Sequence, residues 1–202
     1  FRHNNNSIRE YIRNFIMSTL ETNLIQPSTG TTLTVGASGD TVTAPSGVTV
    51  AGAMANTPAF SANAITGTFT GSVNTFWKAT FNNELYDTNS AYDASNSRFT
   101  VPSGQAGKYH FETAFSSFES TANNNISKWY VAFYKNGSLE LFVTTGGGDL
   151  VGNERTNVLS TTLNLSVADY IEVYLRVNTS GTASYNVGHT YNRFSGHRLI
   201  GV

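Results

Sequence analysis

Residues 81–111 read FNNELYDTNSAYDASNSRFTVPSGQAGKYHF, and aromatic side chains recur along this stretch at wide intervals. Asn, Asp, Ser and Gly fill most of the gaps between the rings, as is typical of turns between short strands. Tyr109 and Phe111 lie two residues apart, so in an extended strand they point to the same face. We therefore expect these two rings to enter one core layer, which Phe99 can reach from another strand.

The sequence around this stretch has the same β character. In residues 170–177 the aliphatic side chains alternate with Tyr, Glu, Tyr and Arg, so one face is expected to be buried and the other, with Tyr170 and Tyr174, to meet solvent or a neighbour. Asn136-Gly137 separates two apolar runs and predicts a two-residue hairpin turn. The spacing of the runs favours a sandwich or jelly roll. The expected strands are residues 59–61, 75–81, 98–101, 108–115, 129–135, 139–143, 158–165, 170–177 and 191–202.

An ordered set of motifs in residues 58–202 resembles the C1q-like domain. The motifs are the ladder Phe81, Asp87, Tyr92, Phe99 and Gly107-Lys108-Tyr109-His110-Phe111, then Tyr134-Lys135-Asn136-Gly137, Leu163 to Val173 and Phe194 to Ile200, with Ala59-Phe60-Ser61-Ala62 as the opening strand. The chain departs from the family pattern at three places. Two extra residues precede Gly107, Thr113 stands where an aromatic is usual, with Phe115 as its substitute, and Ala168 replaces a glycine.

The resemblance implies an all-β, ten-stranded jelly-roll sandwich of the C1q and TNF kind. It also implies a homotrimer about a three-fold axis, with an interface of aromatic and aliphatic residues from the exposed sheet face. We expect five aromatic rings of these motifs to serve core or trimer packing and not ligand contact. They are Phe81, Phe99, Tyr109, Phe111 and Phe194.

Residues 1–27 contain the one convincing helical pattern. Apolar residues recur at helical spacing within residues 7–24, Ser7 with Glu10 has the form of a capping box, and Pro27 ends the pattern. One amphipathic helix cannot bury its own stripe, so this segment is expected to anchor the chain or to trimerise. The alternative is a leader that is disordered or untranslated, with Met17 as the true start.

Residues 28–57 repeat a short Thr/Gly/Ser unit. Its copies are Thr29 to Leu33, Ser38 to Val42 and Ser46 to Val50, at offsets of nine and eight residues. Each copy offers only one or two apolar side chains, so a core would require winding with identical chains, as in a trimeric β shaft. A flexible linker is the alternative.

Composition excludes several classes of protein. With no cysteine, the chain has no disulfide, thiolate metal site or cysteine nucleophile. A formal net charge of −1 argues against nucleic acid as a partner, and no apolar run approaches a membrane span, so no membrane insertion is expected.

No catalytic or metal constellation is recognisable, and no catalytic, cofactor or metal residue is assigned. The histidines are scattered at His3, His110, His189 and His197. The carboxylates Glu112, Glu119, Asp149 and Glu154 could form a glycosidase pair only if folding brought them together. The loop Gly146-Gly147-Gly148-Asp149 is the one stretch that suggests calcium ligands, but it offers a single Asp, and a flexible loop tip is the favoured interpretation.

The order of helix, repeat and β head is typical of a tailed-phage fibre. We therefore expect a non-enzymatic homotrimeric virion protein on the virion surface, whose N-terminal segment binds other virion structural proteins and whose head binds host glycan or surface protein. An architectural virion decoration and a cellular secreted C1q-like adhesin are the alternatives. Recognition is expected in the loops 88–97, 120–127, 145–157 and 178–190.

Overall fold

The structure of the chain is a computed structural model. It describes residues 25, 29–30, 33–43, 45–48, 57–64, 68–69, 74–119, 126–146, 154–179, 185–186 and 192–200. The chain divides into two units, Phe1–Val48 and Thr49–Val202. The helix expected in residues 7–24 lies outside the described residues.

The described part of the first unit consists of turns, bends and segments without regular secondary structure. In two copies of the repeat the Ser-Gly pair forms a turn, and Gly39 and Gly47 take φ values of +96° and +89°, which glycine adopts without strain. The backbone N–H of Asp40 donates to the carbonyl of Ala37 at 3.0 Å, and its carboxylate accepts from the N–H of Ala37 at 2.7 Å.

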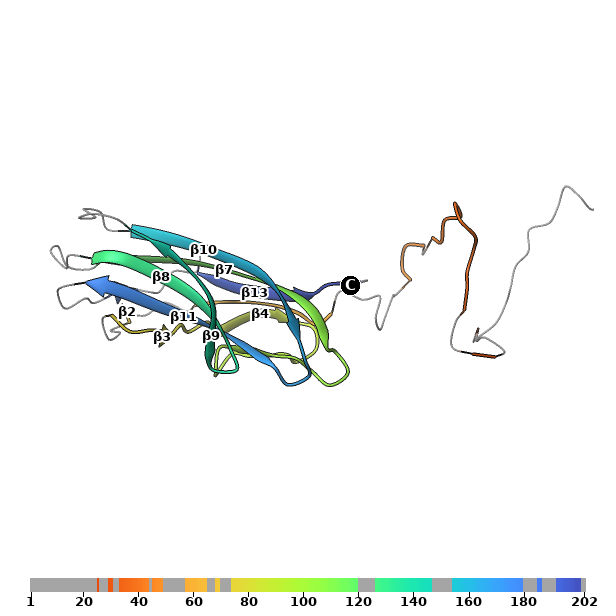
Figure 1. The fold of residues 1–202 in the computed structure, drawn as a ribbon, viewed down its shortest axis with the longest axis horizontal. Coiled ribbons are helices and arrows are strands. Elements are labelled where there is room, and N and C mark those ends of the chain that lie inside the picture. Colours follow the sequence, from red (N-terminus) through yellow and green to blue (C-terminus); the bar gives the residue numbers. More distant parts are fainter. Residues whose placement is uncertain are drawn as a thin grey trace, which may run out of the picture. The chain divides into compact units, whose positions relative to one another are not determined.

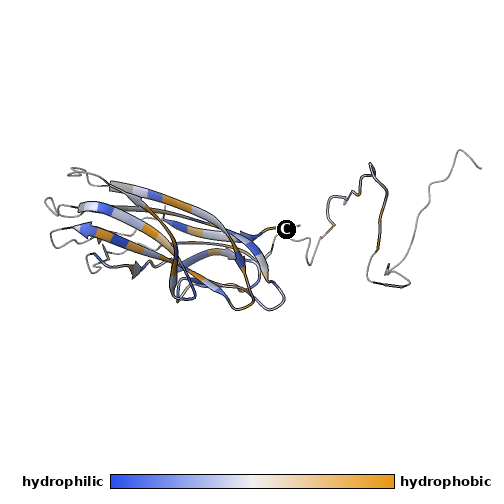
Figure 2. Ribbon diagram, viewed as in Figure 1, coloured by the Kyte–Doolittle hydropathy of each residue, from blue (hydrophilic) through white to orange (hydrophobic). Residues whose placement is uncertain are grey.

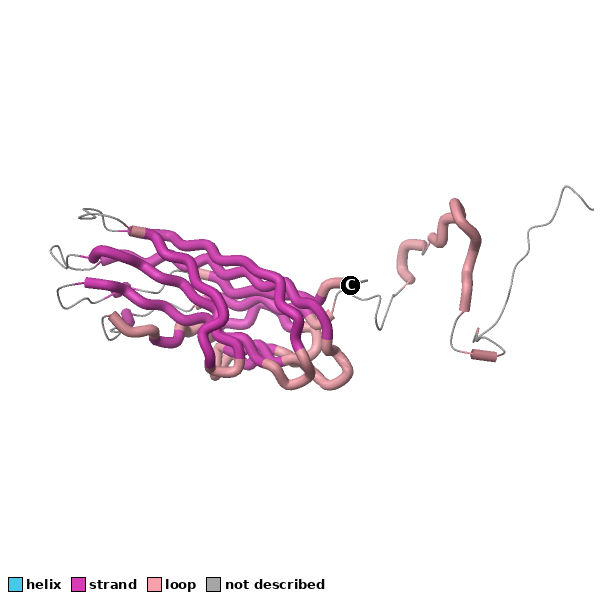
Figure 3. The backbone as a smooth tube through the Cα atoms, in the orientation of Figure 1, coloured by secondary structure: helices cyan, strands magenta, loops and turns pink. Residues whose placement is uncertain are grey.

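The second unit is all β in its described residues and consists of two antiparallel sheets (Figures 1 and 3). Thirteen strands are described, more than the ten that the resemblance implies, and four of them are only two residues long. The strands are β1 (Ala59–Asn63), β2 (Thr68–Phe69), β3 (Trp77–Lys78), β4 (Asn83–Asp87), β5 (Tyr92–Asp93), β6 (Arg98–Thr100), β7 (Gly107–Glu119), β8 (Ile126–Lys135), β9 (Ser138–Thr145), β10 (Glu154–Leu165), β11 (Tyr170–Thr179), β12 (Tyr185–Asn186) and β13 (Arg193–Arg198).

The chain passes repeatedly between the two sheets. The first sheet has the order β2-β12-β7-β13-β1-β4, with β10 also paired to β7. The second sheet has the order β5-β6-β11-β8-β9, with β3 also paired to β11. Strands β6, β7 and β8 therefore alternate between sheets, as do β9, β10 and β11, which is the path of a jelly roll.

An aromatic core fills the space between the sheets, as the spacing of the rings predicts. Phe60 is fully buried and stacks on Tyr92 and Phe99, with ring centroids 4.8 and 5.1 Å away. The rings expected in the core are all fully buried; they are Phe81, Phe99, Tyr109, Phe111 and Phe194. Burial of each such ring stabilises the fold by roughly 1.5–3 kcal/mol. Hydrophobic and polar residues alternate along the long strands, as Figure 2 shows.

Two local predictions have clear outcomes. Asn136 and Gly137 take φ values of 51° and 78° between the paired Lys135 and Ser138, which confirms the two-residue hairpin. Phe115 is buried in place of an aromatic at 113, where the hydroxyl of the buried Thr113 donates to the carbonyl of Arg193 at 2.9 Å.

One strand prediction is wrong, and one edge strand was missed. The strand expected over residues 75–81 is reduced to β3, because Ala79 and Phe81 turn into the core and only Trp77 and Lys78 pair with β11. Strand β4 was not predicted, since Asn83–Asp87 shows no apolar alternation. It lies at the edge of the first sheet, where pairing with β1 on one side is sufficient to hold a polar strand.

Candidate functional site

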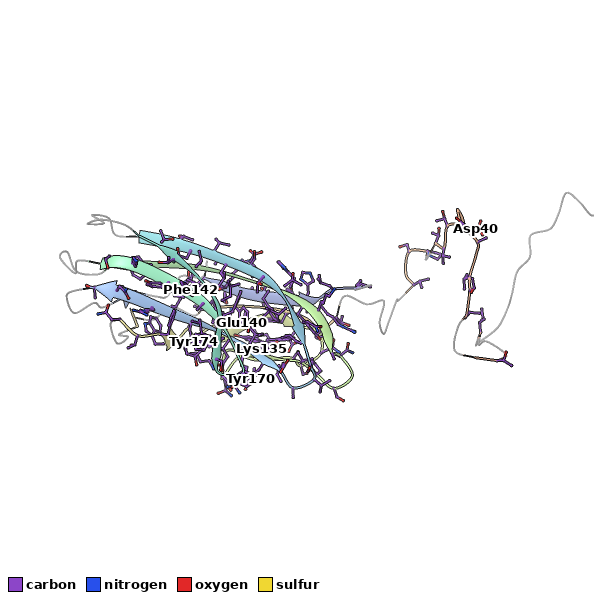
Figure 4. All side chains as sticks on the ribbon, in the orientation of Figure 1. Asp40, Lys135, Glu140, Phe142, Tyr170 and Tyr174 are labelled. Atoms are coloured by element: carbon purple, nitrogen blue, oxygen red, sulfur yellow. The ribbon has the colours of Figure 1, made fainter. Side chains whose placement is uncertain are left out.

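The outer face of the second sheet carries a continuous group of aromatic side chains. We name this group the aromatic face; it consists of Phe76, Tyr130, Tyr134, Phe142, Tyr170 and Tyr174. Strand register places it there, because β8 and β11 send alternate residues inward to the core and the remaining residues outward. Phe142, Tyr170 and Tyr174 are labelled in Figure 4.

The rings of the aromatic face hold one another in place. Tyr134 stacks on Tyr174 with centroids 3.9 Å apart, and Phe76 approaches Tyr130 and Tyr134 edge-on at 6.0 and 5.9 Å. Phe142 packs 5.7 Å from Tyr130 and is 46% exposed. Such ring pairs stabilise a surface by about 0.5–1.5 kcal/mol each beyond burial, so the face is ordered before any ligand arrives.

Beside the rings, a buried carboxylate joins three strands. Glu172 of β11 is 2% exposed, and its Oε1 accepts from Lys78 Nζ at 2.6 Å and from Arg98 Nε at 2.8 Å. Burial alone would raise the pKa of Glu172, but these hydrogen bonds and positive charges outweigh it and lower the pKa. Arg98 also lies over the ring of Tyr170, 4.0 Å from its centroid.

Arg176 is a further cation of this face. Unlike Lys78 and Arg98, it has no carboxylate partner among the described residues. Its guanidinium carbon lies 5.2 Å from the centroid of Tyr130 and 5.7 Å from that of Phe76. Its Nε donates to the side-chain oxygen of Asn178 at 2.8 Å. Within the described residues, the ion pairs join Lys78 and Arg98 to Glu172 and Lys135 to Asp169, and none includes Arg176.

The hydroxyls of Tyr134 and Tyr174 stay protonated at neutral pH. Burial raises the pKa of Tyr134 and of Tyr174, and Glu172 raises that of Tyr174 further. A protonated phenol can both donate and accept a hydrogen bond. The face therefore offers flat apolar rings together with hydroxyls and a guanidinium.

A polar pocket of about 220 Å³ lies at the rim of this face. Its lining residues are Lys78, Ala79, Thr80, Ser95, Asn96 and Ser97. Asp93 fixes the adjoining turn, because its carboxylate accepts from the N–H and hydroxyl of Ser95 and from Asn96. These hydrogen bonds lower the pKa of Asp93 to about 2. The carboxylate of Asp93 is thus engaged by residues of its own turn.

The outer face of the first sheet is different in character. Alternation places small or polar side chains there, including Ala114 and Ser116 of β7 and Ser195 of β13. His110 and His197 are paired across the strands, with ring centroids 5.6 Å apart. Burial and the neighbouring His110 lower the pKa of His197.

The residues considered for catalysis or metal binding do not form a site in the described part of the chain. Glu112 is exposed on β7, and its strand neighbours are Ser160 and Ser195. His3, Asp149 and His189 lie outside the described residues, as does most of the loop suggested for calcium. Among the residues that the structure describes, no cluster of three His, Asp or Glu side chains could hold a metal ion.

Of the loops expected to carry recognition, only 88–97 is fully described.

The alternation in residues 170–177 predicts that Tyr170 and Tyr174 face outward, which is confirmed. It also predicts that Glu172 meets solvent or a neighbour, which is wrong, because Glu172 is buried and paired with Lys78 and Arg98. The pairing of Glu172 with Lys78 and Arg98 was not predicted. Within the ranges that the structure describes, no helix is long and apolar enough to cross a membrane.

Two antiparallel sheets in this strand order, closed over an aromatic core, define a C1q/TNF-like fold. The globular domain of zebrafish complement 1qA protein is similar, with a TM-score of 0.50 and 18% identity over 71% of this chain and 98% of that chain. Murine APRIL has a TM-score of 0.50 and 10% identity over 70% of this chain and 98% of that one. No family model matches the chain, and comparison with curated proteins gave no match. Identities this low show the fold alone.

Proposed function

We propose that the chain is a non-enzymatic homotrimeric structural protein of a tailed phage, a fibre or appendage on the virion surface. Residues 58–202 form its head, and the head attaches to a glycan or protein of the host surface. The observation that carries the attachment function is the ordered, solvent-accessible aromatic face on a C1q/TNF-like scaffold. A rigid β scaffold that presents rings and hydrogen-bonding groups is suited to binding.

The N-terminal segments complete the proposal. Residues 1–27 contact other virion proteins, and the Thr/Gly-rich residues 28–57 connect this anchor to the head as a shaft. The support is the order of a helical pattern, a repeat and a β head in one chain. An unpartnered amphipathic helix and a repeat with few apolar side chains both gain a core by association.

For the trimer contact we propose the outer face of the first sheet. Small side chains such as Ala114 and Ser116 allow close approach of a second copy, and Val158 of β10 is 58% exposed on the same side. A neighbouring copy that covers this face leaves the aromatic face of the second sheet turned outward. This arrangement departs from the aromatic interface that the resemblance implies.

Light scattering of the full chain tests the trimer. We expect three times the monomer mass at micromolar concentration, and Val158→Arg should shift the mass toward monomer, whereas Phe142→Ala should not. A monodisperse monomer at high concentration would overturn the trimer.

Adsorption to host cells tests attachment. The purified chain should bind susceptible cells and compete with the virus for them. A trimer that binds no cell surface and only other virion proteins would favour the architectural alternative.

A further inference from the structure

The aromatic face contains a cation whose charge no described residue neutralises. Arg176 is half-buried among rings, and its one hydrogen bond within the described chain uses Nε and a neutral amide. Lys78, Arg98 and Lys135, in contrast, each reach a carboxylate within 3.1 Å. Because Arg176 donates through Nε alone within the described chain, its two terminal nitrogens remain available to a ligand. Their spacing matches that of the two oxygens of a carboxylate.

We propose that Arg176 and the surrounding rings form a binding site for an acidic sugar, a carboxylate-bearing residue of a host-surface glycan. The proposal rests on the attachment function proposed above and names its ligand class. The sugar carboxylate pairs with the terminal nitrogens of Arg176. The C–H face of the same or the adjacent sugar ring packs on Phe142 and Tyr130, whose rings are 5.7 Å apart.

The exposed rings of this face are suited to a sugar. The rings lie on a sheet, and the pocket recorded at the rim is small and polar, with a volume of about 220 Å³. The flat surface of a single exposed ring such as Phe142 suits a pyranose, which presents an apolar face edged by hydroxyl groups. Tyr134 and Tyr174 are fixed by mutual stacking at 3.9 Å, so little side-chain freedom is lost when a ligand binds.

Charge argues against a two-fold contact in which a second copy of the chain covers this face. In a two-fold contact the same patch meets itself, so Arg176 of one copy would approach Arg176 of the other. Glu172 cannot relieve that repulsion, because Lys78 and Arg98 already engage its carboxylate. The chain as a whole has a formal net charge of −1, so the uncompensated cation is a local feature that favours an anionic partner.

Titration of the full chain with two matched probes tests the site. The first probe is a tetrasaccharide that contains glucuronic acid, and the second is the same tetrasaccharide with each carboxylate reduced to an alcohol. We expect the acidic probe to bind at least tenfold more tightly than the reduced one, with an affinity that falls as salt is added. Equal binding of the two probes would overturn the proposal.

Variants locate the binding. Arg176→Gln should weaken the acidic probe about tenfold and leave the reduced probe unchanged, and Phe142→Ala should weaken both probes. Arg176→Lys, which keeps the charge without the planar fork, should give an intermediate loss. Arg193→Gln is the matched control, because this exposed cation lies on the other sheet. Each tetrasaccharide binds one protomer, so this change should not affect either probe even where it weakens the trimer contact proposed on that sheet.

The remaining outcomes also decide the question. Equal weakening by Arg193→Gln, or displacement of the sugar by inorganic phosphate at similar concentration, would reduce the site to nonspecific anion attraction and overturn it. Loss of the trimer in Arg176→Gln would identify the face as a subunit contact and also overturn it. If the chain adsorbs to host cells and Arg176→Gln adsorbs equally well, this site is wrong and the attachment function stands. If the wild-type chain adsorbs to no cell, the attachment function itself fails.

Discussion

A methyl group at position 196 has no room in the head. An alanine Cβ at Gly196 would lie 2.5 and 2.9 Å from two ring carbons of Phe111 and 3.0 Å from the carbonyl oxygen of His110. The ring cannot move away easily, because Phe111 is fully buried and Phe99, Phe133 and Phe194 pack around it at 5.3 to 6.2 Å. Overpacking of this kind costs about 1–3 kcal/mol.

The sign of the effect makes the test sharp. The backbone at Gly196 is not in the left-handed region, so without the clash Gly196→Ala would stabilise the protein by about 0.4–1 kcal/mol through the unfolded chain. We expect a net loss of about 2 kcal/mol instead. For a unit of this size that loss lowers the melting temperature by roughly 4–8 °C.

Urea unfolding of the full chain at fixed protein concentration measures this loss. Trp129, which is 7% exposed, provides a fluorescence signal from the core. Ser195→Ala is the control, since the neighbouring side chain points to the outer face, and it should change stability by less than about 0.5 kcal/mol. In a Phe111→Leu background the cost of Gly196→Ala should fall by about 1 kcal/mol or more. A variant as stable as the wild type, or an unchanged cost in that background, would refute the packing explanation.

Three further changes have defined outcomes. Ala168 has a φ of 68°, so Ala168→Gly should raise the free energy of unfolding by about 0.5–1 kcal/mol in the same urea assay. Glu172→Gln should lower the melting temperature at pH 7. Because folding lowers the pKa of Glu172, its contribution is present at neutral pH and is lost as the pH falls through the folded value, so the melting temperatures of wild type and variant should converge as the solution is acidified. Asp169 accepts from Asn136 at 2.7 Å and from the N–H of Ser166 at 2.9 Å, so Asp169→Ala should increase hydrogen exchange in both turns, and exchange confined to one turn would contradict the link.

Local signals in the sequence predicted much of the head. The hairpin at Asn136-Gly137 follows from two residues that accept positive φ, and the shared core layer of Tyr109 and Phe111 follows from their alternation. The edge strand β4 could not be predicted in this way. Its side chains are mostly polar and exposed, and only its pairing with β1 makes it a strand.

The candidate site was only partly predictable, because it depends on strand order. Alternation in β11 predicts that Tyr174 faces outward, but the stack on Tyr134 requires β8 to lie beside β11 in one register. Glu172 shows the same limit more strongly. Its burial depends on Lys78 and Arg98, which come from two other strands that are distant in sequence.

The pairing of strand β1 with strand β13, which are far apart in the sequence, has a consequence for biosynthesis. Strand β1 is held between β4 and β13, with Ala59 opposite His197, so one of its two edges stays unpaired until β13 has left the ribosome. A nascent head exposes that edge and part of its aromatic interior throughout synthesis. Sheets closed by such distant segments fold slowly, because the long loop must form before the contacts that stabilise it. Chaperone dependence and low-temperature expression are therefore expected to govern how much of this protein reaches its folded state.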